Sequence, residues 1–336
     1  MTTQNHIIFT HYGSSGYLAK TLKCAKVTNR DAKIILIGDE NNLDLADLSQ
    51  ISHRHFNTLT ESPLRSEFYK VFKPIRGTFH PLFRNGRNWL MYVFERWFYV
   101  YELAQEMNLE SFWHFDSDTM ILKDLTEYNK YFSEYDSTEQ CVGSCLNGFV
   151  KTQVLEQYLK VINQLFTDEH FLKIQQDEFD TVNPEYAFTE MRAWVKTKER
   201  LSFNTCHIGK VINDQTWDDS IVLGQEMGYE MIRLKSGQTM KNIYWSDGFY
   251  CNNKHLQKII EFMSLNLSHA PIFVFDWVLS HCETKNASKY LAKTPVPIKE
   301  VAIGIARNIK RVITHYLAKI IAALSHLSQR NELTSL

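Results

Sequence analysis

Two aspartates separated by one residue, Asp116 and Asp118, are the side chains of this sequence best suited to chemistry. They follow an aromatic run, residues 112–115, and precede an apolar run, residues 119–122. Aromatic residues favour a strand, and Asp and Ser favour a turn at its end. Carboxylates that share a tight turn can face one point, which suits Mg²⁺ or Mn²⁺ held by carboxylates and substrate phosphates. The alternative is an ordinary solvated turn.

Arg96 is a further candidate, because it lies in an apolar stretch, residues 90–103, whose pattern predicts a helix. An unpaired guanidinium would be costly there, so Arg96 should find an acid or a phosphate. From Arg65 to Arg96 the chain carries seven Lys and Arg against two Glu, with aromatic residues interleaved. This composition fits either a local positive funnel for a diphosphate or a solvated basic face. The net charge of −1 argues against a nucleic-acid partner.

The elements that must position these residues begin with an apolar run at 7–12, a helical stretch to residue 27 and a strand at 33–39. Strand, helix and strand in this order predict an α/β fold with a parallel sheet. Ligands of such sheets bind beyond the carboxyl ends of the strands. Asp39 could equally serve as a cap or turn residue. The candidate ligand-binding residues at this edge are Thr10, His11, Tyr12 and Asp39.

The segment that runs from the helix into the Asp-Ser-Asp turn, residues 95–122, resembles the central part of bacterial GT-A glycosyltransferases. In that family a helix with an Arg-Trp pair precedes a strand ending in Asp-x-Asp. The first strand, the Leu-Ile-Gly-Asp end of the second and the order of later segments also fit, over about residues 1–270. The resemblance implies a Rossmann-like, mostly parallel GT-A domain at 1–290. It also implies metal-dependent transfer of a sugar from a nucleotide-diphosphate sugar to a hydroxyl acceptor.

The same resemblance implies roles for the candidates on the donor side. Asp118 would be the main ligand of Mn²⁺ or Mg²⁺, and Asp116 would bond the ribose or reach the metal through water. Asp39 would bond the base or ribose, and Arg96 would steady the phosphates. Asn147, with the glycine that follows it, would face the donor sugar, unless the pair is a plain strand-to-helix turn before a helix at 154–165.

A third metal ligand is expected near the end of the core. Many GT-A enzymes place a histidine there, inside His-x-x-Gly-x-x-Lys, and His269 occupies the corresponding position. The Gly and Lys of that motif are missing from this chain. A buried structural histidine is therefore the alternative for His269, and His281 is a weaker rival for the ligand role.

The acceptor side needs a carboxylate within hydrogen-bond reach of the acceptor hydroxyl. Residues 213–216 partly match a Ser-Asp-Met-Thr segment of the family, which makes Asp214 the first candidate for a general base and Asp218 the second. The alternative for Asp214 is an N-cap of a helix expected to run to residue 227. The resemblance also implies a last helix of the core at 256–267.

A Pro-containing breaker at 294–297 separates the core from a C-terminal appendage, residues 295–330. Apolar residues recur at helical spacing from 298 to 327, and five Lys and Arg oppose one Glu on the other face. A basic amphipathic helix indicates contact with a membrane surface. The alternative is packing on the core or on a second subunit.

Composition bounds the remaining possibilities. The chain of 336 residues is long enough for one large α/β domain. Its start lacks the features of a signal peptide, and no apolar run reaches about 18 residues, which predicts a cytoplasmic protein, peripheral at most on the inner face of the membrane. The six scattered cysteines indicate buried thiols in place of disulfides or a zinc site.

The sequence thus predicts a hexosyltransferase-type enzyme of cell-surface polysaccharide or glycoconjugate synthesis, with a glycan or lipid-linked acceptor. One rival is a sugar nucleotidyltransferase, which needs a Gly-rich loop with Arg or Lys after the first strand. Residues 13–16 carry no such base, and they fit neither a dinucleotide fingerprint nor a P-loop. The other rival is a non-catalytic relative that binds glycan or nucleotide.

Overall fold

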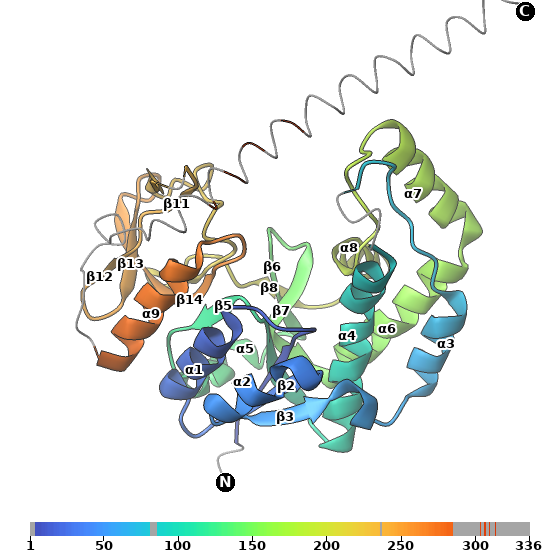
Figure 1. The fold of residues 1–336 in the computed structure, drawn as a ribbon, viewed down its shortest axis with the longest axis horizontal. Helices are drawn as coiled ribbons and strands as arrows, with labels where there is room; N and C mark the ends of the chain where they lie inside the picture. The colour runs from blue at the N-terminus through green and yellow to red at the C-terminus, as the bar shows by residue number, and fades with distance from the viewer. Residues whose placement is uncertain are drawn as a thin grey trace, which may run out of the picture.

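The computed structural model describes residues 4–80, 86–235 and 237–284, together with positions 303, 306, 309 and 313 (Figure 1). The predicted amphipathic stretch at 298–327 therefore lies outside the described residues, apart from these four helical positions. Two of them, Ile309 and Ile313, expose 56% and 53% of their surface. The division into a domain at 1–290 and an appendage at 295–330 stays a prediction.

A central sheet organises the described part of the chain, and all of its strands except β7 run in the same direction. The predicted α/β fold with a mostly parallel sheet is confirmed. In spatial order the strands are β3 (Ser52–His55), β2 (Lys33–Gly38), β1 (His6–Thr10), β4 (Ser111–Asp116), β7 (Cys145–Lys151), β6 (Ser137–Gln140) and β8 (Thr205–His207).

Helices cover both faces of this sheet (Figure 1). The α-helices of the described residues are α1 (Leu18–Thr28), α2 (Leu43–Leu48), α3 (Pro63–Val71), α4 (Gly86–Glu106), α5 (Asn129–Phe132), α6 (Thr152–Thr167), α7 (Glu169–Thr181), α8 (Glu190–Arg200) and α9 (Ile272–Thr284). Short 3₁₀ turns occur at η1 (Glu40–Asn42), η2 (Phe56–Thr58) and η3 (Leu125–Tyr128).

The side chains of β1 show why helices pack on both faces of the sheet, because successive side chains of a strand point to opposite faces. Ile8 joins a core with α4 and α6, and Ile7 and Phe9 join a second core with α1 and α2. All three side chains are fully buried. The carboxyl end of β1 is thereby fixed between two packed layers.

A second, mostly antiparallel sheet lies beside the first and packs with α9. Its strands are β12 (Tyr244–Trp245), β13 (Phe249–Asn253), β14 (Lys258–Asn266) and β5 (Thr119–Ile121), with β9 (Gln215–Trp217) pairing to β14. Strands β10 (Met231–Arg233) and β11 (Thr239–Lys241) form a separate pair. Because β4 belongs to the first sheet and β5 to the second, the Asp-Ser-Asp turn is the link between the two sheets.

Two predicted helices are wrong. Residues 214–227 form the short strand β9 followed by turns, and residues 256–267 contain the long strand β14. The predicted helices at 90–103 and 154–165 are confirmed as α4 and α6. The six cysteines are free thiols, and four of them are buried. Among the helices that the structure describes, none has both the length and the apolar character needed to cross a membrane.

Candidate functional site

The carboxyl ends of β1 and β4 meet at one edge of the central sheet. Thr10 and Asp116 are partners in the register of these strands, so their backbones lie side by side. β2 ends next to β1 and leads into Asp39. The edge predicted for Thr10 and Asp39 thus also holds Asp116.

Arg96 of α4 lies behind the Asp-Ser-Asp turn and pairs with two acids. Its Nη1 is 2.6 Å from Asp116 Oδ1, and its Nη2 is 3.0 Å from Glu190 Oε1 at the start of α8. The Arg96 side chain is only 12% exposed. Burial alone would raise the pKa of Asp116, but the Arg96 charge outweighs it and lowers that pKa. Of the two expected partners, an acid or a phosphate, the structure shows acids.

Asp118 is half-buried and titrates differently from Asp116. Burial, followed by the charge of Asp116, raises the pKa of Asp118 to about 6. Its backbone carbonyl accepts a hydrogen bond from Leu267 N at 3.0 Å, just beyond the end of β14. The two carboxylates are thus held between the two sheets. The charge of Arg96 keeps Asp116 ionised, whereas burial and the charge of Asp116 favour the protonated form of Asp118.

His11 holds this turn in place. Its Nδ1 lies 2.8 Å from Ser117 Oγ, and its Nε2 lies 3.1 Å from Ser15 Oγ. Burial lowers the pKa of His11 to about 4, so the ring is neutral at pH 7. The neighbouring Tyr12 is instead 67% exposed, with its ring 6.5 Å from that of Phe56. An exposed aromatic ring at this edge is suited to stacking on a nucleoside base.

Groups of the protein itself occupy the hydrogen-bonding positions of the Asp39 carboxylate. Asp39 caps η1 through Asn41 N, and its carboxylate also accepts from Gly13 N at 2.9 Å and from the side-chain amides of Asn41 and Asn42. These four donors match the roughly four acceptor positions of a carboxylate. The geometry therefore shows the cap and turn role that was the alternative for Asp39.

Asn147 is also engaged internally. This residue of β7 is 1% exposed, donates from Nδ2 to Gln140 Oε1 at 2.6 Å and accepts from Gly148 N at 3.0 Å. Gly148 has φ 92°, and a Cβ there would lie 2.3 Å from Thr138 Oγ1, so glycine is required. Both residues belong to a strand, and the expected strand-to-helix turn comes later, at the start of α6.

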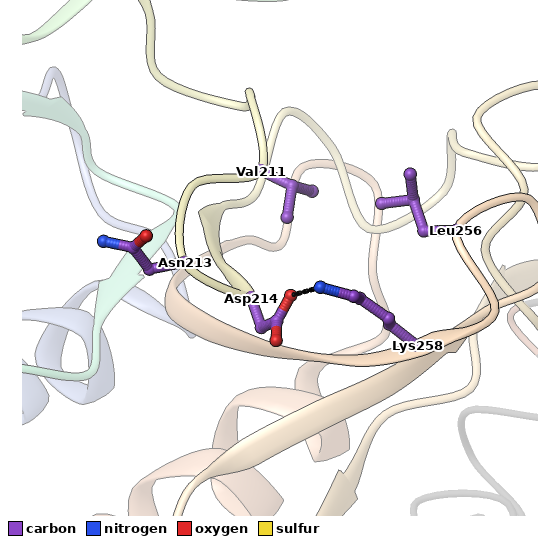
Figure 2. A pocket seen from close by; sticks show the side chains of 5 residues that line it. All are labelled: Val211, Asn213, Asp214, Leu256 and Lys258. Atoms are coloured by element: carbon purple, nitrogen blue, oxygen red, sulfur yellow. Dashed lines mark hydrogen bonds and ion pairs between the residues drawn. The ribbon is translucent and has the colours of Figure 1, made fainter.

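Asp214 is not near the Asp-Ser-Asp turn, which corrects its assignment as first candidate for the general base. It occupies a two-residue hairpin turn in which Asn213 and Asp214 have φ 51° and 61°, and Ile212 and Gln215 exchange backbone hydrogen bonds. Asn and Asp are favoured in such turns, so no helix cap forms. Its exposed carboxylate pairs with Lys258 at 2.7 Å on the wall of a surface pocket of about 470 Å³ (Figure 2).

The second sheet sets the distance between that turn and the aspartate pair. Asp214 O accepts from Glu261 N, whereas Asp118 O accepts from Leu267 N. Six residues of extended chain span about 20 Å. Asp214 and Asp118 therefore lie toward opposite ends of β14 and cannot act on one hydroxyl.

Asp218, the second candidate for the base, is sealed inside the protein. It is 1% exposed, lies 2.5 Å from Lys241 Nζ and accepts from Asn266 N at 3.1 Å. Burial raises its pKa, although the charge of Lys241 opposes the increase. An acceptor hydroxyl has no route to a carboxylate in this setting, so Asp218 is corrected to a structural residue.

His269 follows β14 on an exposed loop with φ 66°. The described residues contain no group of three or more His, Cys, Asp or Glu that could hold a metal, so His269 does not complete a set with Asp116 and Asp118. The alternative of a buried structural histidine is also wrong for His269. That description fits His281 of α9, which is fully buried with Nδ1 2.7 Å from Trp277 O.

The sequence interpretation missed Asp219 and His207. Both Asp219 carboxylate oxygens lie within 2.9 Å of His207 Nε2, and they also accept from the backbone N–H groups of Cys141 and Val142. His207 ends β8 and Cys141 follows β6, and both strands run parallel to β4. Had the edge rule been applied to these later strands, it would have indicated His207.

Comparison with known proteins finds no family model and no curated protein that matches this sequence. Among solved structures, the apo form of mouse xyloside xylosyltransferase 1 overlaps 63% of this chain and 88% of its own at 9% identity, with a TM-score of 0.41. The PaToxG glycosyltransferase overlaps 59% and 69% at 10% identity, with a TM-score of 0.35. GlyE of Streptococcus pneumoniae TIGR4 overlaps 63% and 46% at 11% identity, with a TM-score of 0.29. Similarities of this extent assign no activity to this chain.

Proposed function

We propose that this chain transfers a sugar from a nucleoside-diphosphate sugar to a hydroxyl acceptor, with Mn²⁺ or Mg²⁺ bound at Asp116 and Asp118. The observation that carries the proposal is the placement of these two carboxylates. They lie on the turn from β4 to β5, at the edge of a parallel sheet where ligands characteristically bind. The order of segments and the Asp-x-Asp turn support a GT-A-type enzyme, which the family resemblance implies.

The side chains present fit a hard cation that takes further oxygens from a substrate. Asp116 and Asp118 offer oxygen ligands only, and within the described residues no third His, Cys, Asp or Glu joins them. Mg²⁺ is commonly held by one or two carboxylates together with phosphates. Burial and the charge of Asp116 raise the pKa of Asp118, and a cation would favour its ionised form. When bound, the ion would stabilise negative charge that develops on the leaving diphosphate.

The chain's own residues would bind and orient the donor. Arg96 keeps Asp116 ionised through their 2.6 Å contact, and His11 fixes the turn through Ser117. Tyr12 presents an exposed ring at the end of β1, where a base can stack. Thr10 is buried at the same edge, where its hydroxyl interacts with the side chain of Tyr92.

The proposed acceptor is a glycan or lipid-linked hydroxyl in polysaccharide or glycoconjugate synthesis. The composition of residues 298–327, with apolar residues at helical spacing and an excess of Lys and Arg, supports a membrane-associated acceptor on the cytoplasmic side. This part of the proposal rests on sequence alone.

A panel of nucleoside-diphosphate sugars, incubated with the purified full-length protein and Mn²⁺, tests the function. We expect release of nucleoside diphosphate from one donor, with the release abolished by EDTA. Consumption of a nucleoside triphosphate and a sugar phosphate, with release of pyrophosphate, would identify a nucleotidyltransferase instead. Tight nucleotide binding without turnover of any donor would identify a binding protein.

A further inference from the structure

Outside the Asp116–Asp118 turn, one histidine is held in the manner of a catalytic base. His207 Nε2 lies 2.9 and 2.8 Å from the two carboxylate oxygens of Asp219. Asp219 is itself fixed, because Cys141 N and Val142 N donate to its oxygens at 3.1 and 3.3 Å. Its side chain is 6% exposed, whereas that of His207 is 29% exposed. The carboxylate is buried behind the ring, and the ring reaches the surface.

The dyad of His207 and Asp219 stands at the same edge of the sheet as the proposed donor site. Strand β8 is three strands away from β4, which is about 14 Å at the usual strand spacing. Asn266 connects the two places, since its Nδ2 donates to Asp219 O at 3.0 Å and its backbone is in register with Thr119, the residue after Asp118. A donor sugar and an acceptor hydroxyl would occupy the space between a metal-bound diphosphate and this histidine.

The other groups near the dyad are unsuited to taking a proton. Burial, assisted by the charges of Asp116 and Asp219, raises the pKa of Cys141 to about 12, so its thiol stays protonated. Glu139 is paired with Lys198 at 2.7 Å and accepts from Trp194 Nε1. His207 differs from both, because Asp219 occupies its Nε2 and leaves Nδ1 for a substrate.

Resting on the proposed function, we propose that His207 is the catalytic base for the acceptor and that Asp219 is its positioning residue. The neutral ring donates Nε2–H to Asp219 and carries a lone pair on Nδ1. The acceptor O–H bond breaks, and its proton passes to Nδ1. The acceptor oxygen forms a bond to the anomeric carbon as the bond from that carbon to the diphosphate oxygen breaks, and the diphosphate leaves with the electron pair.

The electrostatics agree with this geometry. The hydrogen bond to Asp219, opposed by burial, raises the pKa of His207 above its usual value. A base is most effective when its pKa lies near the working pH, and loss of such a base costs about 10²–10⁴ in rate. A histidine held by a buried carboxylate has the required orientation and basicity.

The test uses His207→Gln, with His170→Gln as the matched control because His170 is an exposed residue of α7. We expect His207→Gln to lower the rate of donor turnover by about 10²–10⁴. Calorimetric affinity for the nucleoside diphosphate with Mn²⁺ should stay unchanged, and the control should match wild type. In His207→Ala, added imidazole should restore part of the turnover.

Three results would overturn the assignment. Turnover by His207→Gln within a few-fold of wild type would remove the base role. A loss of turnover that imidazole does not restore, or that comes with lost nucleotide affinity, would make His207 a structural residue. In these cases wild-type turnover leaves the proposed transferase function standing. A wild-type protein that turns over no donor would overturn both proposals.

Discussion

Arg96 Nη1 lies 2.6 Å from Asp116 Oδ1, so the middle of α4 is tied directly to the end of β4. The same guanidinium reaches Glu190 of α8 at 3.0 Å, and all three side chains are less than a third exposed. One cation therefore connects α4 and β4, which follow each other in the sequence, with the distant helix α8. The Arg96 guanidinium also keeps Asp116 ionised. The proposed metal site therefore depends on the contact between Arg96 and Asp116.

Replacing Arg96 with Gln should destabilise the fold strongly. Removing one partner of a buried ion pair leaves uncompensated charge and typically costs about 3–5 kcal/mol. Asp116 and Glu190 would both lose their cation, so we expect a loss in that range from urea unfolding at pH 7. The matched control is Lys196→Gln, because Lys196 pairs with Glu199 at the surface, where the side chains are 36% and 54% exposed. That change should cost about 1 kcal/mol or less. Similar losses in the two variants would show that the Arg96 contacts are not essential.

Asp118→Asn should remove metal-dependent nucleotide binding. The exchange keeps the size of the side chain but replaces a charged hard ligand with a weak neutral one. Calorimetry should show that wild type binds the nucleoside diphosphate much more tightly with Mn²⁺ than with EDTA, and that Asp118→Asn has lost this difference. Retention of the full Mn²⁺ effect in Asp118→Asn would exclude Asp118 as a ligand.

The raised pKa of Asp118 predicts how stability depends on pH in the absence of metal. Its folded-state pKa of about 6 exceeds the usual aspartate value of 3.8, so the folded state binds the proton more tightly. The protonated carboxyl of Asp118 therefore stabilises the folded state at low pH, and this contribution is lost as the pH rises through about 6. In EDTA, Asp118→Asn should be more stable than wild type by about 1–2 kcal/mol at pH 8, a figure reduced for partial exposure, and about equal at pH 4. Thermal unfolding at both values measures this, and an equal difference at pH 4 and pH 8 would contradict it.

The sequence predicted the first half of the fold well, because that half is built from local patterns. Apolar runs and helical spacing identified β1, α1, β2, α4 and β4, and the parallel-sheet rule then placed Thr10 and Asp39 at one edge. The second sheet was harder to predict from the sequence. The family resemblance implied a helix at 256–267, but a short run rich in apolar residues fits a strand as well as a buried helix, and periodicity does not separate the two.

Asp214 shows a different reason for failure. Asn and Asp favour both helix N-caps and left-handed turn positions, and here the turn between Ile212 and Gln215 prevails. The contact between Arg96 and Glu190 was beyond sequence reasoning for yet another reason. Glu190 is 94 residues from Arg96, and no local sequence pattern predicts a contact over that separation.

Asp214→Asn should leave donor turnover within about twofold of wild type, because a side chain about 20 Å from Asp118 cannot reach the same substrate. Asn tolerates the left-handed backbone, so the turn should persist. Loss of the exposed pair with Lys258 should cost less than about 1 kcal/mol of unfolding free energy. A loss of turnover as large as removal of a general base causes, about 10² or more, would restore Asp214 as a catalytic candidate. Lys258→Gln breaks the same ion pair from the other side and serves as the control.

The stretch beyond Pro297 should bind anionic membranes. Its sequence carries five Lys and Arg against one Glu beside a long apolar series, and each cation near an anionic surface contributes about 1 kcal/mol. Full-length protein should therefore sediment with vesicles that contain phosphatidylserine, and higher salt should weaken this binding. A chain ending at Thr294 should keep donor turnover but lose vesicle binding.

Neutral phosphatidylcholine vesicles are the control for that experiment, since they lack the charge that the basic residues would contact. Exposure of Ile309 and Ile313, at 56% and 53%, leaves these described positions of the stretch available to a partner. If truncation unfolds the protein or dissociates a dimer, and the full chain never bound vesicles, the apolar series is a protein contact. The membrane proposal then fails, and a soluble acceptor replaces the lipid-linked one.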